Sequence, residues 1–277
     1  FERVNFICVI KPLSQNKKGR FMEFIQRKIQ SLAESVFNHN ALNNEFYQRW
    51  MGGPLSLGDV EVFARNYLAR TTQISRMVAL SFMGTDDLHA QVEIVKNLYS
   101  EMGYGNPEKA HLALLENYLI DLLSRLADRP YSMDELTSLP VLESTRTFSR
   151  EQLSLYTDGG RNNNPRHVLG TLLAQEWLAY SMLTRLYEGA RNYQHLYANN
   201  DDFHEHCEYF YIHIGDAEKE HKIQAVKAAT LECTSDQHVE EVSVSFNRFL
   251  IITEQYWNGI AHAMPCEKNR DAARLTI

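Results

Sequence analysis

Hydrophobic positions recur every three to four residues along most of the chain, and the two-residue alternation typical of strands is nearly absent after residue 10. Clusters rich in Gly, Pro, Asn and Asp interrupt this pattern and mark turns. The pattern predicts an all-α fold, a bundle of about seven core helices. The expected helices span residues 20–38, 42–51, 56–83, 86–102, 107–127, 132–157, 165–193, 201–230 and 235–263.

No internal repeat or inter-domain linker stands out along the chain. We therefore expect one domain over residues 20–265, with an N-terminal extension (1–19) and a C-terminal tail (266–277). Ser56 has the residue type of a helix N-cap, and so do Thr85 and Asp86.

Composition narrows the class of protein. The 277 residues are 44% hydrophobic and 23% charged, which suits one large domain with a full core. A net charge of −7 argues against nucleic acid as a partner, and no apolar run approaches the ~18 residues of a membrane span. The four cysteines are scattered without CxxC spacing, which is typical of reduced thiols. Reduced thiols are typical of the cytoplasm, where we therefore expect this protein.

The segment from His213 to His221 holds two imidazoles and three carboxylates within nine residues. It follows an aromatic run, 208–212, that we expect to be buried. Charges entering an apolar environment cost several kcal/mol each unless they pair or bind a metal. The segment therefore indicates a metal site; the alternative is a solvated helix face with two incidental histidines.

A second pair of candidate ligands flanks a predicted helix junction. Glu101 falls in the last turn of one helix and His111 in the first turns of the next. Gly103 suits the position just after a helix, and Pro107 suits the first turn of a new one. A tight helical hairpin can aim both side chains at one point. The alternative is a surface acid and a partly buried surface histidine.

Glu176 is the only acid between Arg166 and Tyr187. It continues an apolar stripe of one helix face, at i+7 from Leu169. A lone acid on such a stripe needs a cation, a hydrogen-bond network or a proton. The alternative is a buried ion pair with an arginine.

Taken in order, six residues resemble the ligand pattern of the haem-oxygenase-like diiron oxidases and oxygenases. The similarity extends to the neighbouring sequence, in particular Asn97-Leu-Tyr-Ser-Glu-Met-Gly and Leu169-Gly-Thr-Leu-Leu-Ala-Gln-Glu. It spans about residues 20 to 262. It implies a haem-oxygenase-like bundle that binds two Fe2+ ions. The implied metal ligands are Glu101, His111, Glu176, His213, Glu218 and His221.

The resemblance also implies the roles of these residues. Glu101, His111 and His213 would lie nearer one iron. Glu218 and His221 would lie nearer the other, with Glu176 as the bridging, catalytic carboxylate.

The implied activity is that of a non-haem diiron oxidoreductase with O2 as co-substrate. The substrate would be a small amino-acid-like molecule, a carboxylate or an amine, in specialised metabolism. Some N-oxygenating relatives use an extra carboxylate on the preceding long helix, but residues 63–84 contain no acid here. This favours C–H or C–C oxidation over N-oxygenation.

The late motif departs from the family pattern by one extra residue. The family places an acid four residues after its first histidine, where this chain has Ala217. We expect a π-bulge or kink between His213 and His221, eased by Gly215. Without it, Asp216 or Glu220 would compete with Glu218 for the metal.

Four arginines are candidate anchors for a substrate carboxylate, because the guanidinium group binds carboxylates through two hydrogen bonds. Arg166, at the start of the predicted central helix, is our choice for substrate binding; its alternative role is a surface salt bridge. The four are Arg70, Arg76, Arg161 and Arg166.

Three other functions compete with the diiron hypothesis. One is a cofactor-free enzyme that resembles thiaminase-II or pyrroloquinoline-quinone synthase, and another is a non-enzymatic helical binding protein. The third is an iron-storage bundle, which needs Glu-x-x-His on two helices; Glu218 and His221 have that spacing on the late helix. We expect a small-molecule substrate, and a homodimer stays open.

Overall fold

The computed structural model describes residues 13–161 and 164–264, without the side chains at 13–18, 158–161 and 216–220. The secondary structure of these residues is helical, with no strand, as predicted. The α-helices are α1 (Leu13–Glu34), α2 (Glu45–Gly52), α3 (Leu57–Thr71), α4 (Ile74–Met83), α5 (Leu88–Glu101), α6 (His111–Ala127), α7 (Met133–Ser138), α8 (Glu143–Arg161), α9 (Pro165–Ala190), α10 (Asn200–His206), α11 (Glu208–Ile214), α12 (Asp216–Leu231) and α13 (Asp236–Ala263). Short 3-10 helices are η1 (Ser35–Asn38), η2 (Gly103–Gly105), η3 (Pro107–Lys109) and η4 (Arg191–Leu196).

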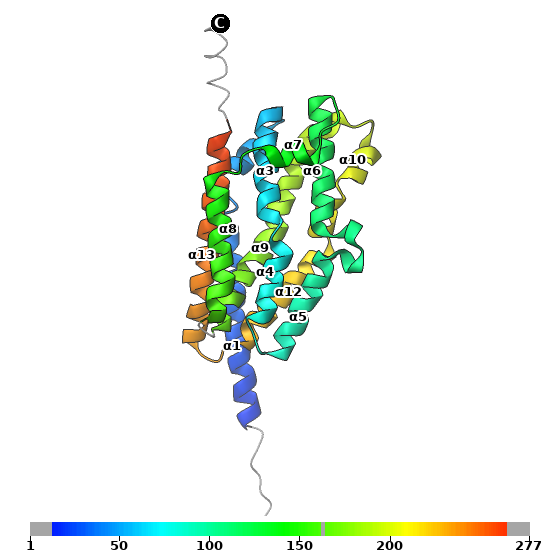
Figure 1. Cartoon of the computed structure of the whole chain (residues 1–277). Coiled ribbons are helices and arrows are strands. Elements are labelled where there is room, and N and C mark those ends of the chain that lie inside the picture. The colour runs from blue at the N-terminus through cyan, green and yellow to red at the C-terminus, as the bar shows by residue number, and fades with distance from the viewer. Residues whose placement is uncertain (1–12, 162–163, 265–277) are drawn as a thin grey trace, which may run out of the picture.

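The long helices form an elongated bundle with α9 at its centre (Figure 1). α9 packs against α13, α12, α8, α2 and α11. Gly170 allows the close approach of α9 to α13, because a Cβ there would lie 2.2 Å from the Val242 carbonyl oxygen. Most of α9 is therefore buried, and an acid on it is enclosed by protein.

An aromatic core holds α2, α3 and α13 together. The rings of Phe46 and Trp257 stack at a centroid distance of 4.5 Å, and Trp50 packs on Phe63 at 4.7 Å. The Trp50 indole N–H donates to the Leu186 carbonyl oxygen of α9 at 2.8 Å. Burial of such large rings is a main source of stability in the bundle.

Three of the predicted helices are interrupted. The 56–83 segment breaks between α3 and α4, where the Thr72 hydroxyl donates to the Ala69 carbonyl oxygen and competes with the helix backbone. The 132–157 segment breaks at Pro140, whose ring disfavours helical backbone in the residue before it. The 201–230 segment is divided at Cys207 and again at Gly215.

The ends of the elements show smaller differences. Ser56 caps α3 as predicted, but Asp87, not Thr85 or Asp86, caps α5 by accepting from the Ala90 N–H. The first helix begins at Leu13, inside the predicted extension, while the predicted tail lies outside the described residues. None of the helices described is both long and apolar enough to cross a membrane.

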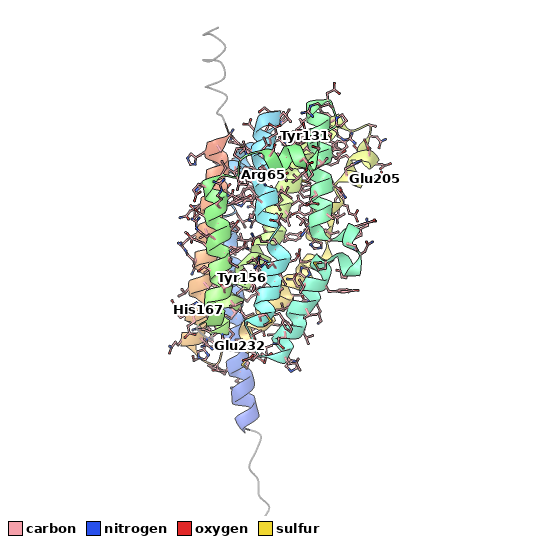
Figure 2. All side chains as sticks on the ribbon, in the orientation of Figure 1. Arg65, Tyr131, Tyr156, His167, Glu205 and Glu232 are labelled. Carbon is pink, nitrogen blue, oxygen red and sulfur yellow. The ribbon has the colours of Figure 1, made fainter. Side chains whose placement is uncertain are left out.

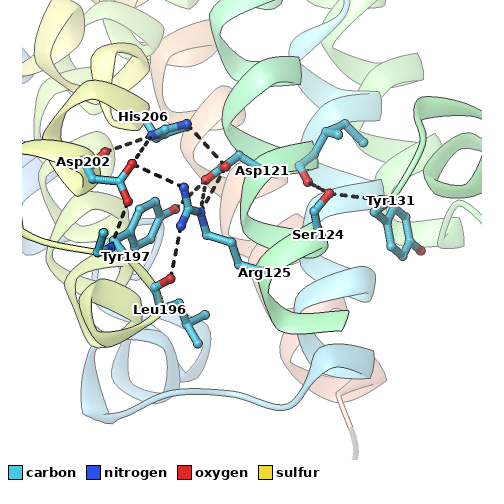
Figure 3. Close-up of polar contacts among 10 residues, drawn as sticks. Asp121, Ser124, Arg125, Tyr131, Leu196, Tyr197, Asp202 and His206 are labelled. Carbon is cyan, nitrogen blue, oxygen red and sulfur yellow. Dashed lines mark hydrogen bonds and ion pairs between the residues drawn. The ribbon is translucent and has the colours of Figure 1, made fainter. Parts of the chain in front are cut away.

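A polar network fastens α6 to the segment that leads into α11 (Figure 3). Arg125 pairs with Asp121 at 3.0 Å and donates to the Leu196 carbonyl oxygen at 3.1 Å. The Tyr197 hydroxyl donates to Asp121 at 2.8 Å, and His206 lies 3.4 Å from the same carboxylate. These contacts hold α10 against α6, so they also position α11, which follows α10 directly.

Candidate metal centre

Three predicted ligands meet where α5, α6 and α11 come together. Glu101 ends α5, His111 begins α6, and His213 lies in the last turn of α11. Each offers one ligand atom, and these three atoms lie within 4.8 Å of one another. We call these residues the first cluster.

The hairpin between α5 and α6 brings Glu101 and His111 together. Gly103 has φ +64°, in the left-handed region, and a Cβ there would lie 2.4 Å from the Lys109 carbonyl carbon. Pro107 starts the 3-10 turn that precedes α6. The predicted turn is therefore confirmed, and only glycine fits its tightest position.

His213 is presented as a neutral imidazole. Its Nδ1 lies 2.7 Å from the Tyr209 carbonyl oxygen, a contact in which the ring nitrogen donates, so Nε2 keeps its lone pair. Burial, and then the neighbouring His111, lower the pKa of His213 to about 3. The neutral ring with one nitrogen fixed by a backbone carbonyl is the form in which histidine binds metals.

Glu101 offers a metal ion a negative charge, and His111 offers it a ring nitrogen that has no hydrogen-bond partner. The Glu101 Oε2 and His111 Nδ1 atoms lie 3.3 Å apart, and this buried Nδ1 has no hydrogen-bond partner. Burial raises the pKa of Glu101, but the neighbouring imidazoles, His111 first among them, together outweigh burial and the net pKa is lowered. A carboxylate beside two imidazoles is a donor set that suits iron.

Glu176 and His221 form a second group, which we call the second pair. The Glu176 Oε2 atom of α9 and the His221 Nδ1 atom of α12 lie 3.8 Å apart. Both residues are buried, at 5% and 6% exposure. Glu176 lines the cavity of the first cluster and also a smaller cavity that contains His221. It therefore lies between the first cluster and His221, the position that the sequence predicts for a bridging carboxylate.

A chain of hydrogen bonds from α8 orients Glu176. The Gln175 amide donates to the Glu176 Oε1 atom at 3.2 Å. The side-chain oxygen of Gln175 in turn accepts from the Tyr156 hydroxyl at 3.0 Å and from the Gln152 side-chain amide at 3.3 Å. Tyr156 is labelled in Figure 2. Such outer partners fix the direction of a metal-binding carboxylate.

The late segment is kinked at the predicted place. α11 ends at Ile214, Gly215 has extended backbone (φ −83°, ψ −167°), and α12 begins at Asp216. A helix break at Gly215, rather than a π-bulge, therefore absorbs the extra residue. The side chains of Asp216, Glu218 and Glu220 lie outside the described residues, so the identity of the acid ligand stays a prediction.

Two cavities accompany the site. The smaller, of about 10 Å³, is lined by Glu93, Asn97, Gln224 and the second pair, together with apolar residues. The larger, of about 50 Å³, has room for a few water molecules or a small ligand. The larger one is lined by Tyr67, Arg70, Thr71, Ile74, Glu101, His111, Gln175, Glu176, Ala179, Met182, Leu183, Tyr209 and His213.

Two polar residues of α5 line the site although their role was not predicted from the sequence. Asn97 is 3% exposed, and its Oδ1 atom has no hydrogen-bond partner; the buried Oε2 atom of Glu93 has none either. Both residues share a helix face with Glu101, because the three are spaced by four residues. That spacing is the signal that would have found them.

The arginines are distributed differently from our expectation. Arg166 pairs with Glu241 of α13 and lines neither cavity. Arg76 also lines neither, and the side chain of Arg161 lies outside the described residues. Arg70 lines the larger cavity.

Comparisons with solved structures agree on the fold. A CADD-like protein of unknown function from Nostoc punctiforme has a TM-score of 0.66 at 16% identity, covering 87% of this chain and 99% of its own. A domain with a haem oxygenase-like fold from Shewanella denitrificans has a TM-score of 0.57 at 15% identity, covering 91% and 92%. The haem-oxygenase-like fold is thereby confirmed.

Sequence comparisons go further than the fold. A 4-aminobenzoate synthase of Chlamydia pneumoniae is 28% identical over 94 residues, and this match spans 34% of the chain and only 41% of that relative. A model of the iron-containing redox enzymes matches residues 61–252, which include the first cluster and the second pair. The chain belongs to this family of iron-containing redox enzymes.

Proposed function

We propose that this protein is a non-haem diiron enzyme that uses O2 to oxidise a small molecule. The observation that carries the proposal is the position of Glu176 between the first cluster and His221. One buried carboxylate with two groups of histidine and acid ligands around it is the arrangement of a carboxylate-bridged metal pair.

The residues present would hold the two ions as follows. Glu101, His111 and His213 would hold one iron, and Glu176 would contact both. His221 would hold the other iron, with Glu218 as its further acid. Asn97 offers an additional oxygen donor, since its Oδ1 atom is buried without a partner in the cavity of the second pair.

Bound iron would supply the electrons that reduce O2 and the oxidising power needed to attack the substrate. The chain itself has three tasks. The Tyr209 carbonyl holds His213 in the tautomer that leaves Nε2 to bind. Gln175 keeps Glu176 in place. Apolar side chains of α4 and α9, such as Ile74 and Leu183, limit the water in the cavity where O2 and substrate would meet.

We propose C–H or C–C oxidation of a small substrate as the reaction type. The reason is still the lack of acids in residues 63–84. Glu93 changes this argument, because it places an acid of α5 beside the second pair. N-oxygenation is therefore the alternative outcome, and product analysis distinguishes the two.

Anaerobic titration with Fe(II) tests the proposal, followed by measurement of O2 consumption. Wild type should bind two iron ions per chain and consume O2. Glu176→Ala should bind one or fewer and lose O2 consumption, because the bridging carboxylate is removed. Glu205→Gln, which changes an exposed acid of α10, is the control and should behave as wild type.

Circular dichroism should show that Glu176→Ala keeps the helical content of the bundle. If wild type binds no stoichiometric iron, and a chelator leaves substrate turnover unchanged, the diiron proposal is wrong. A cofactor-free enzyme of the same fold would then take its place.

A further inference from the structure

The wall of the larger cavity contains a buried cation that the proposed metal chemistry does not use. Arg70, in the last turn of α3, is 4% exposed and lines this cavity together with the first cluster. A buried guanidinium is costly unless an anion or a set of acceptors compensates its charge.

The contacts of Arg70 compensate this charge only in part. Its Nη1 atom donates to the Met182 sulfur at 3.2 Å, and sulfur is a weak acceptor. The guanidinium carbon lies 5.0 Å and 5.3 Å from the ring centroids of Phe148 and Tyr256. The Nε atom is buried and has no hydrogen-bond partner. Among the described side chains, no carboxylate forms an ion pair with Arg70.

Two half-buried arginines of the bundle, in contrast, have acidic partners. Arg125 pairs with Asp121, and Arg166 pairs with Glu241. The acids that share the cavity with Arg70 are Glu101 and Glu176, the candidate metal ligands. No described carboxylate forms an ion pair with Arg70, so its guanidinium is the group that an incoming anion would meet.

We propose that Arg70 binds the carboxylate group of the substrate, which must then be a small monocarboxylic acid. The substrate role rests on the proposed function, whereas the binding of a carboxylate does not. The unpartnered Nε–H and an Nη–H of one guanidinium present the two parallel donors that a carboxylate accepts.

The other residues of the cavity wall determine the length and polarity of the part of the acid beyond its carboxylate. The cavity's apolar wall includes Ile74, Ala179 and Leu183, and its small volume of about 50 Å³ favours a short chain. An α-ammonium group would lie beside Arg70 and find no acid on the described wall other than the metal ligands. The site therefore selects a short acid with an apolar body over the corresponding α-amino acid.

Isothermal titration calorimetry with butanoate, butanamide and 2-aminobutanoate tests the proposal. It is run on metal-free and on anaerobic Fe(II)-loaded protein, because a carboxylate can also bind iron directly. Wild type should bind butanoate about tenfold or more tighter than either analogue in both forms, as expected for a charge-assisted pair.

Arg70→Met should abolish this preference and retain the packing against Met182. Arg65→Met is the matched control: Arg65, labelled in Figure 2, lies on the same helix, donates to the Leu139 carbonyl oxygen and does not line the cavity. It should keep the full preference. If Arg70→Met does not fold, the role of Arg70 is tested instead by NMR of the arginine Nε–H groups in wild type. One Nε–H, assigned by its loss in Arg70→Lys, should shift with butanoate and not with butanamide.

Two results overturn the proposal: equal binding of butanoate and butanamide to wild type, or an unchanged preference in Arg70→Met. A preference for 2-aminobutanoate would overturn the choice of acid. Iron stoichiometry is measured separately, so failure of the diiron proposal is distinguishable. If the protein binds no iron but still prefers butanoate through Arg70, this inference stands and the proposed function is wrong.

Discussion

Glu176 and His221 approach within 3.8 Å across the interface of α9 and α12, although one lies on the central helix and the other on a late one. The contact explains why an acid interrupts the apolar stripe of α9. Gln175 holds one oxygen of this carboxylate, and the other oxygen faces His221. A metal bound there would complete a site that the bundle has already organised.

The hydrogen bond from Tyr156 to Gln175 should matter for metal binding although neither residue is a ligand. In Tyr156→Phe, Gln175 loses a donor and can rotate, so Glu176 is less well oriented. We expect iron affinity to fall by about tenfold, as is usual for outer partners of metal ligands. Competition with a calibrated Fe(II) chelator measures it.

Tyr131→Phe is the control for this experiment. Tyr131 is labelled in Figure 2; its hydroxyl donates to Glu61 at 2.8 Å, and the residue lines neither cavity. Loss of this hydroxyl should cost about 1 kcal/mol of stability and leave iron affinity unchanged. Equal iron affinities in the two variants would show that the Tyr156 hydroxyl has no part in orienting Glu176.

Gly103→Ala should damage both the fold and the first cluster. Alanine at φ +64° is strained, and its Cβ would overlap the backbone at Lys109. We expect a loss of at least about 2 kcal/mol in the free energy of unfolding, together with weaker iron binding as Glu101 and His111 separate. Urea denaturation and Fe(II) titration measure the two effects.

Gly58→Ala is the matched control, because Gly58 is an exposed residue in the first turn of α3 with nothing within 4 Å of an added Cβ. Alanine there should be neutral or stabilise the protein by up to about 1 kcal/mol. If Gly103→Ala were as stable as this control, the account of the hairpin would be wrong.

The pair of Arg166 and Glu241 should contribute to stability in a pH-dependent way. Hydrogen bonds from Arg166 and then Asn164 lower the pKa of Glu241 in the folded protein. Its contribution is therefore present above the unfolded pKa of about 4.3 and is lost as pH falls through the lower folded value. Arg166→Gln should destabilise the protein by at most about 1 kcal/mol at pH 7, and the difference should shrink below pH ~4.

Thermal unfolding of wild type and Arg166→Gln from pH 3 to 7 measures this difference. Butanoate binding should be the same in both proteins at pH 7, since Arg166 lines neither cavity. Loss of butanoate binding in Arg166→Gln would show that Arg166, as first expected from the sequence, binds the carboxylate.

Helix content and the order of the ligands could be read from the sequence because both depend on local pattern. The positions of Glu101 and His111 at a helix junction follow from Gly103 and Pro107 alone. The break at Pro140 was equally local and should have been predicted. The break at Gly215 was expected, but its form depends on how α11 and α12 pack, which no spacing rule specifies.

The choice among arginines shows the limit of sequence reasoning. Arg166 and Arg70 are alike as residues, and only the tertiary packing pairs one with Glu241 and leaves the other on the cavity wall. Asn97 could have been found from its four-residue spacing to Glu101. Its unpartnered oxygen, however, becomes visible only when α9 and α12 are in place around it.

The most direct test of the diiron site is a crystal structure of protein loaded anaerobically with Fe(II), with an anomalous map at the iron edge. We expect two peaks: one about 2.0–2.2 Å from ligand atoms of Glu101, His111 and His213, and one at the same distance from His221, with Glu176 contacting both. A single peak, or two peaks without Glu176 between them, would contradict the account.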